Sequence, residues 1–203
     1  MESFKKLNNI IGWLIFLIAT SVYLATMEKT ASLWDCGEFI AAAYKLEVVH
    51  APGAPFFLMM GRIFSLFASD ITQVAVMINS MSALASSFTI LFLFWTITAF
   101  GRKIYAKQGK IELEKIYAIL GSGIVGSLAY TFSDSFWFSA VEGEVYAMSS
   151  LFTALVFWCI LKWEDGFSKP RSSKWLVFIS FLIGLSTGVH MLNLLAIPAI
   201  VII

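Results

Sequence analysis

Residues 54–68 read APFFLMMGRIFSLFA, and the topology of the whole chain depends on whether this stretch crosses a membrane. The stretch is apolar, but it has only 15 residues and carries Arg62 in its middle. A helix needs about 20 predominantly apolar residues to span a bilayer, with a range of roughly 17 to 25. Length therefore argues against a crossing, and the distribution of charge along the rest of the chain decides the question.

The composition of the 203-residue chain is that of a membrane protein. Hydrophobic residues make up 59% and charged residues 13%, with a mean hydropathy of +0.83. Soluble domains carry about 25% charged residues. The numbers exclude a disordered chain, an ordinary soluble enzyme and a nucleic-acid binder that works through a basic surface. We predict an all-α integral membrane protein built as a multi-span helical bundle, with membrane lipids and no nucleic acid among its partners.

Five further segments are long and apolar enough, or nearly so, to cross a bilayer. A sixth begins near Leu192 and is cut off, because the chain is apolar to its last residue. We therefore expect the 203 residues to be the N-terminal part of a larger transmembrane domain. The five predicted spans are 10–27, 74–100, 116–132, 145–161 and 175–190.

The basic residues fix the orientation of these spans. If residues 54–68 do not cross, segments 1–9, 101–115 and 162–174 share one side and hold 11 of the 14 basic residues. Cytoplasmic loops carry such an excess of Lys and Arg. A crossing at 54–68 would move the five basic residues of 101–115 outside and break the rule. We predict a cytoplasmic N-terminus, and an external loop over 28–73 that carries interfacial or re-entrant helices.

This topology places eight of the 13 acids and both histidines of the chain on the external side. Asp35 and Glu38 are three residues apart, so they share one face of a helix predicted over Cys36–Lys45. One interpretation is a catalytic carboxylate pair, with one member acting as a general base. The alternative is a capping box, in which Asp35 caps the helix and Glu38 sits at its third position.

Three further positions complete the candidate set. His50 stands in the turn HAPGAP, where Pro52 and Gly53 break the chain between two helices. A solvent-facing histidine on a rigid turn is the alternative to a substrate contact. Glu144 lies at the start of the span 145–161, where an acid also favours the helix dipole. His190 ends a predicted span and has the alternative role of a polar anchor.

The motifs together resemble a known family. WDCGEF (34–39), HAPGAPFFLMMGRIFSLF (50–67), VEGEVYAMSSLF (141–152) and GLSTGVHMLNLL (184–195) occur in this order. The same order is found in bacterial membrane proteins similar to the plexin-type protein O-mannosyltransferase family. That family belongs to the GT-C superfamily of polyprenyl-phosphate-sugar glycosyltransferases. The resemblance implies a GT-C type bundle, of which this chain would be the N-terminal part, and a bacterial inner membrane.

The resemblance also assigns roles to the candidate residues. Asp35 matches the acid of the first external loop and implies the catalytic base, and Glu38 matches the second acid there. His50, Pro52 and Gly53 match an H-P-P-G turn, in which this chain has alanine at the first proline. Glu144 matches the acid of a G-E-V-[FY]-A motif, and His190 a histidine after the later glycines.

The implied reaction is inverting sugar transfer on the external, periplasmic face. The donor would be a sugar on a polyprenyl phosphate, and the acceptor a hydroxyl of an exported protein or a glycan. The leaving phosphate needs positive charge. Arg62 is a candidate for this role, with interfacial snorkelling as the alternative. We assign no residue as a metal ligand and no certain cofactor, although a divalent cation would fit the chemistry. Two other functions stay open: a transporter or flippase for a lipid-linked substrate, and a non-catalytic membrane scaffold.

Overall fold

The computed structural model describes residues 2–106, 112–168 and 172–201. Over these residues the secondary structure is helical, without strands, which confirms the predicted all-α class. The helices are α1 (Glu2–Thr26), α2 (Cys36–Lys45), α3 (Pro55–Ser65), the 3-10 turn η1 (Ile71–Gln73), α4 (Val74–Ala106), α5 (Leu113–Thr131), α6 (Asp134–Ala140), α7 (Val145–Asp165), α8 (Ser173–Thr187), the 3-10 helix η2 (Met191–Leu195) and α9 (Ala196–Val201).

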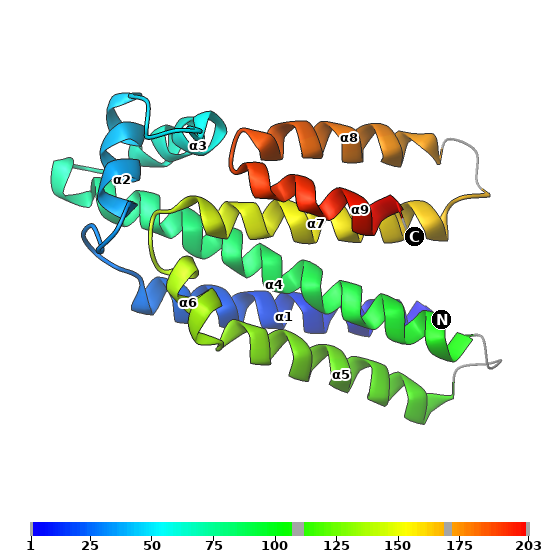
Figure 1. Ribbon diagram of the computed structural model, residues 1–203. Coiled ribbons are helices and arrows are strands. Elements are labelled where there is room, and N and C mark those ends of the chain that lie inside the picture. Colours follow the sequence, from blue (N-terminus) through cyan, green and yellow to red (C-terminus); the bar gives the residue numbers. More distant parts are fainter. Residues whose placement is uncertain (1, 107–111, 169–171, 202–203) are drawn as a thin grey trace.

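The long helices run side by side and give the bundle two different ends (Figure 1). The short helices α2, α3 and α6 gather at one end, which we call the loop end. Both termini of the described chain lie at the opposite end, which we call the terminal end. Helices α1 and α5 flank α4 on one side, and α7 and α8 lie on its other side.

Helix α4 is the centre of the bundle, because it packs against α1, α5 and α7 at once. Its 33 residues make it about 50 Å long at 1.5 Å per residue. The helix is apolar on all sides, as expected for a helix surrounded by others in a membrane protein. Small residues such as Ala83, Ser86 and Ser87 are fully or almost fully buried and allow neighbouring helices to approach closely.

Three helical segments are long and apolar enough to cross a bilayer by themselves: Ser3–Thr26, Ile71–Tyr105 and Val145–Asp165. Helices α5 and α6 reach this standard only as a pair, bent by 68° at the break between them. The predicted span 175–190 corresponds to α8, a shorter apolar helix of 15 residues that ends at Thr187. The structure thus contains three or four candidate spans within the described residues, together with shorter apolar helices.

Within residues 54–68, Pro55–Ser65 form α3, an 11-residue helix at the loop end. Pro55 stands in its first turn, where the missing N–H costs no hydrogen bond. At 1.5 Å per residue the helix is about 16 Å long, which is roughly half the thickness of a hydrocarbon core. This length agrees with the prediction that residues 54–68 do not cross as a helix.

Basic residues are concentrated at the terminal end, where some of them pair with acids such as Glu164 and Asp165. The described basic residues of the predicted inner segments lie at the ends of α1, α4, α5, α7 and α8 that point to the terminal end. Asp35, Glu38 and Asp134 belong to the helices at the loop end, and Glu142 and Glu144 lie in the link between α6 and α7. Four of the counted basic residues lie outside the described residues: Lys107, Lys110, Lys169 and Arg171.

Candidate functional site

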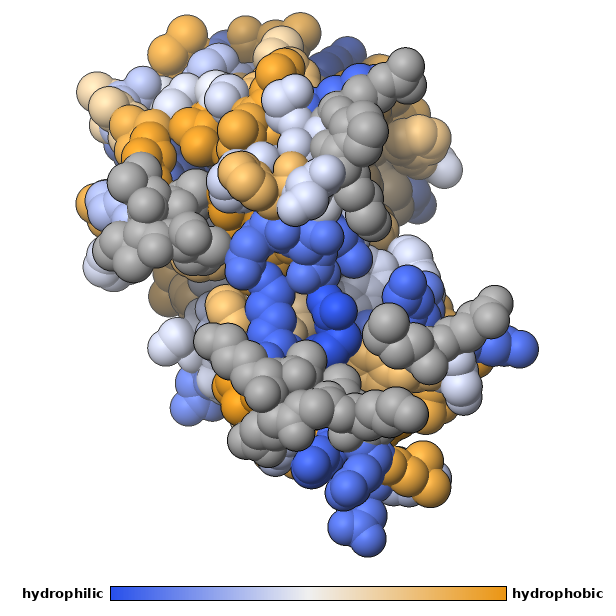
Figure 2. All heavy atoms as spheres, turned by 90° about the vertical axis from the view of Figure 1, so that its right-hand side faces the viewer, coloured by the Kyte–Doolittle hydropathy of each residue, from blue (hydrophilic) through white to orange (hydrophobic). Residues whose placement is uncertain are grey.

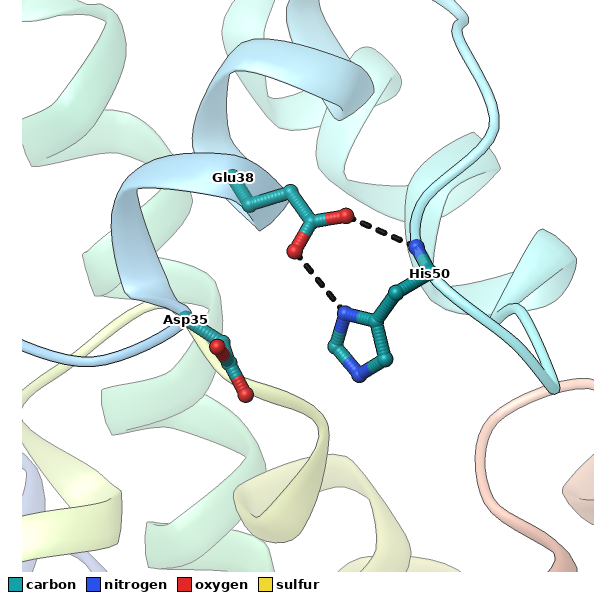
Figure 3. Close-up of side chains that lie close together, drawn as sticks. All are labelled: Asp35, Glu38 and His50. Carbon is teal, nitrogen blue, oxygen red and sulfur yellow. Dashed lines mark hydrogen bonds and ion pairs between the residues drawn. The ribbon is translucent and has the colours of Figure 1, made fainter.

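Glu38 and His50 form a two-point contact at the loop end (Figure 3). The backbone N–H of His50 donates to Oε1 of Glu38 at 2.7 Å, and the Nδ1 atom of His50 lies 2.8 Å from Oε2. The hydrogen bond to the His50 ring lowers the pKa of Glu38 below its usual range. The same bond raises the pKa of His50. One carboxylate therefore fixes both the backbone and the ring of the histidine.

The turn that carries His50 is built by the residues that follow it. The N–H of Gly53 donates to the carbonyl of His50 at 2.8 Å, closing a four-residue turn that includes Pro52. Gly53 has a φ of +78°, a left-handed conformation that glycine adopts without steric cost. Pro52 and Gly53 thus shape the turn, and His50 is the residue of this turn that contacts Glu38.

Asp35 stands at the first position before α2, beside Glu38 and His50 (Figure 3). Its side chain makes no capping hydrogen bond, and Glu38 is bonded to His50 instead of to the start of the helix. The capping-box alternative is therefore wrong for this helix. The preceding residue, Trp34, has a φ of +75° and is 87% exposed. A non-glycine residue in this conformation is strained, and such strain is concentrated at functional sites.

Two further carboxylates, Glu142 and Glu144, are buried at this end, and Glu144 lies close to both Glu142 and Asp35. Glu142 is 2% exposed and accepts a 2.5 Å hydrogen bond from the hydroxyl of Ser32. Burial raises the pKa of Glu142, and the bond from Ser32 opposes the rise. Glu144 is 4% exposed, and its Oε1 atom has no hydrogen-bond partner among the described residues. Glu144 was predicted from the sequence as a site residue, and Glu142 was not.

The pKa of Glu144 rises to about 7. Burial is the largest cause, because a charged carboxylate is penalised away from water. Repulsion from Glu142 and Asp35 adds to the rise, and the backbone of Asp35 partly offsets it. Near neutral pH the protonated and the charged forms of Glu144 are therefore both populated, next to the more exposed Asp35.

Asn79 of α4 holds the loop that leads to these acids. Its Nδ2 atom donates to the carbonyls of Glu28 and Thr30, at 2.7 and 3.0 Å. Gly143 lies so close to α4 that a Cβ atom there would be 2.8 Å from Oδ1 of Asn79. Asn79 was not predicted from the sequence. The available signal was a single amide in an otherwise apolar span, which is costly in a membrane unless it is bonded.

The structure places Arg62 away from the Glu38–His50 contact. Its Nη1 atom donates to the carbonyl of Tyr44 at 2.9 Å, and its guanidinium lies 5.3 Å from the centre of the Tyr44 ring. Tyr44 is near the end of α2, six residues and about 9 Å along the axis from Glu38. Arg62 thus joins α3 to the C-terminal end of α2. This contact differs from both roles considered for Arg62 from the sequence, which were phosphate binding and interfacial snorkelling.

His190 lies in the link between α8 and η2. Its Nδ1 atom accepts a weak 3.3 Å bond from the N–H of Leu192, and its ring centre is 5.7 Å from that of Tyr146 at the start of α7. Nearby, the carbonyl of Gly188 accepts a 2.8 Å bond from the N–H of Phe56. These contacts bring His190 to the loop end, and within the described part of the chain no hydrogen bond or ring contact joins it to Asp35, Glu38 or His50.

Asp35, Glu38 and His50 together have the composition of a cation site. Each offers one ligand atom, and these atoms lie within 4.8 Å of one another. Two carboxylates and one imidazole suit a divalent ion such as Mn²⁺, which accepts both oxygen and nitrogen ligands. These residues therefore fit a divalent cation, which the sequence alone left as a possibility without any assigned ligand.

These features define a class: an all-α membrane protein with carboxylates and a histidine at one end of its bundle and lysines at the other. The chain belongs to the family described as the protein O-mannosyl-transferase TMEM260 N-terminal domain, whose model matches residues 35–203. The match begins at Asp35 and includes α2, the His50 turn, Glu144 and His190.

Two curated relatives carry the same name. The protein O-mannosyl-transferase tmem260 of Dictyostelium discoideum is 27% identical over 197 residues, covering 91% of this chain and 22% of that protein. The protein O-mannosyl-transferase TMEM260 of Mus musculus is 25% identical over 173 residues, covering 85% of this chain and 22% of that protein. The chain thus spans about a fifth of the length of these relatives. No solved structure matches it.

Proposed function

We propose that this chain is the N-terminal part of a GT-C type protein O-mannosyltransferase, and that the loop end carries part of its active site. The main support for this proposal is that Asp35 lies beside the Glu38–His50 pair and the buried Glu144. The relatives' names support mannose as the sugar and a protein as the acceptor. An exported protein or a glycan would reach the loop end from outside, which in a bacterial inner membrane is the periplasm.

In this proposal Asp35 is the general base of an inverting transfer. The acceptor hydroxyl oxygen attacks C1 of the sugar and forms the new bond, while the bond between C1 and the phosphate oxygen breaks. The hydroxyl proton moves to the Asp35 carboxylate, and the electron pair leaves with the polyprenyl phosphate. A base within hydrogen-bond reach contributes about 10²- to 10⁴-fold to such a step.

The neighbours of Asp35 supply orientation and charge. Glu38 holds the ring of His50, whose Nε2 atom is then free to contact a sugar hydroxyl or the donor phosphate. Because the pKa of His50 is raised, more of its imidazole is cationic near neutral pH than in a free histidine. Alternatively, a divalent cation held by Asp35, Glu38 and the neutral imidazole of His50 would supply the positive charge to the leaving phosphate.

A groove between α4, α5 and α7 suits the polyprenyl chain of the donor. It has a volume of about 490 Å³, and its walls combine apolar side chains with hydroxyls. Tyr130 and Ser149, within two turns of the ends of α5 and α7, mark its end nearest the loop end. Its other described lining residues are Thr89, Leu93, Thr96, Ile97, Gly126, Ser150, Thr153, Ala154 and Phe157.

The test is transfer of labelled mannose from polyprenyl-phosphate mannose to a Ser/Thr-containing acceptor by Asp35→Asn. The matched control is Asp134→Asn, which removes an exposed acid at the same end of the bundle. We expect Asp35→Asn to lose at least about 100-fold in rate while the control keeps its activity. A fully active Asp35→Asn protein would remove the catalytic role. Lipid-linked substrate that crosses the membrane unchanged would instead favour the flippase.

A further inference from the structure

A second cavity opens at the terminal end, where α1, α4, α7 and α8 meet. Its volume is about 770 Å³. Figure 2 looks onto this end and shows a hollow lined by hydrophilic residues. Arg102 on its wall is 23 residues along α4 from Asn79, which places the cavity about 35 Å from the candidate active site. The proposed transfer reaction does not use it.

A chain of indole rings forms the deeper wall of the cavity. The ring centres of Trp13 and Trp95 are 6.2 Å apart, those of Trp95 and Trp158 are 5.7 Å apart, and those of Trp158 and Trp175 are 6.1 Å apart. All four tryptophans line the cavity. Tryptophan is enriched at the headgroup level of a bilayer, where an apolar body and a polar N–H are both accommodated. A cavity with such a wall therefore suits the depth of lipid headgroups.

The mouth of the cavity is positively charged. Lys5, Arg102 and Lys162 line it, and Asp165 is the one acid among its described lining residues. Arg102 bonds Asp165 at 2.5 Å, and the Nζ atom of Lys162 lies 5.0 Å above the ring of Trp158. One carboxylate thus faces three cations, and the excess positive charge favours an anion.

The polar groups of the wall favour an anion that also carries hydroxyls. Asn8, Asn9 and Thr98 line the cavity between the indoles and the basic mouth. The Oδ1 atom of Asn8 is buried and has no hydrogen-bond partner among the described residues. An unbonded buried acceptor is costly, so a ligand O–H that reaches it would bind more tightly.

We infer that this cavity binds the headgroup of an anionic phospholipid from the adjacent leaflet. The phosphate lies between Lys5, Arg102 and Lys162, the headgroup hydroxyls reach Asn8, and the acyl chains leave along the tryptophan wall into the bilayer. Basic pockets between membrane helices on the cytoplasmic side bind anionic headgroups in this way. The site would hold the lysine-rich end of the bundle to the inner leaflet.

The test is native mass spectrometry of the protein in neutral detergent, titrated with phosphatidylglycerol or with phosphatidylcholine. Lys5→Gln/Lys162→Gln removes two cavity charges. Lys6→Gln/Lys174→Gln is the matched control, because it removes two exposed charges at the same end that do not line the cavity. We expect wild type and control to bind phosphatidylglycerol at least tenfold more tightly than phosphatidylcholine, and the cavity variant to lose this preference.

A cavity-filling variant and a competition with inorganic phosphate test the lipid site further. Ala99→Phe keeps every charge but fills part of the cavity, so it should also weaken phosphatidylglycerol binding, while gel filtration checks that each variant is folded. Equal phosphatidylglycerol affinity of the cavity variant, the control and Ala99→Phe would overturn the inference. Millimolar inorganic phosphate that displaces phosphatidylglycerol completely would also overturn it, because the cavity would then be a site for free anions.

Discussion

The Nδ1 atom of His50 lies 2.8 Å from Oε2 of Glu38, and the other oxygen of the same carboxylate accepts the His50 backbone N–H. This pair joins the N-terminal turn of α2 to the turn that precedes α3. It leaves the Nε2 atom of the ring as the one nitrogen available to a ligand. The charge on the ring therefore depends on Glu38, which gives the pair a measurable signature.

The His50 ring should titrate above the usual histidine value of about 6.5, because the bond to Glu38 raises its pKa. Glu38→Gln removes the anion, and the pKa of His50 should then return toward 6.5. The measurement is an NMR titration of ring-labelled histidine. The chain has two histidines, and His190→Gln assigns the two signals. An unchanged His50 pKa in Glu38→Gln would contradict the contact.

The same pair predicts a pH window for its contribution to stability. The raised pKa of His50 gives stability that is complete below about pH 6.5 and is lost as pH rises through the folded value. The lowered pKa of Glu38 gives stability that is complete above about pH 4.5 and is lost as pH falls through the folded value. The difference in unfolding temperature between wild type and Glu38→Gln should be largest between these limits.

The contribution of the buried Glu144 to stability should change with pH in the opposite direction to that of Glu38. Its pKa rises from 4.5 to about 7, so its stabilisation is complete below pH 4.5 and is lost as pH rises through about 7. Glu144→Gln mimics the protonated form and should be more stable than wild type at pH 8, by about 3 kcal/mol at most. Thermal unfolding at pH 5 and pH 8 measures this. The slope should persist in Asp134→Asn, and a wild type without the slope would contradict the assignment.

Arg62 should act on stability and not on the donor phosphate. Arg62→Gln removes the bond to the Tyr44 carbonyl and the contact with its ring, which should lower stability by roughly 1–3 kcal/mol. The KM for a polyprenyl-phosphate sugar should change less than about twofold where the variant is folded. A KM increase of tenfold or more would restore the phosphate-binding role considered for Arg62.

The groove between α4, α5 and α7 can be tested by filling it. Ala154→Phe places a ring among its lining residues and should raise the KM for a donor with a long polyprenyl chain. A donor with a short chain does not need the groove, so its KM should stay unchanged. Kinetics with both donors separate this effect from a general loss of folding, which would affect the two alike.

The sequence predicted the elements that depend on local pattern. The starts of α4 at Val74 and of α7 at Val145, and both ends of α2, lie where apolar runs and turn residues indicated them. Helix α8 was predicted to reach His190, but it ends at Thr187, where the Gly188 carbonyl bonds the N–H of Phe56. That bond joins residues 132 apart, and no local pattern contains it.

Part of the site could be predicted because its residues are close in sequence. Asp35, Glu38 and His50 lie within 16 residues of one another, so one helix and one turn were enough to bring them together. The partner of Glu142 is Ser32, 110 residues away, and the contacts of Asn79 are carbonyls about 50 residues away. Arg62 was predicted to bind phosphate because of its charge. In the structure its guanidinium instead bonds a backbone carbonyl near the end of α2.

The central claim is that the carboxylates at the loop end and the lysines at the terminal end face opposite sides of one membrane. Trp34→Cys is next to Asp35 at a highly exposed position, and Lys174→Cys is exposed at the other end. The two native cysteines are buried, and wild type measures their background. A membrane-impermeant maleimide added to intact cells should label Trp34→Cys, and should label Lys174→Cys only after the cells are opened. Labelling of both positions from the same side would contradict the account.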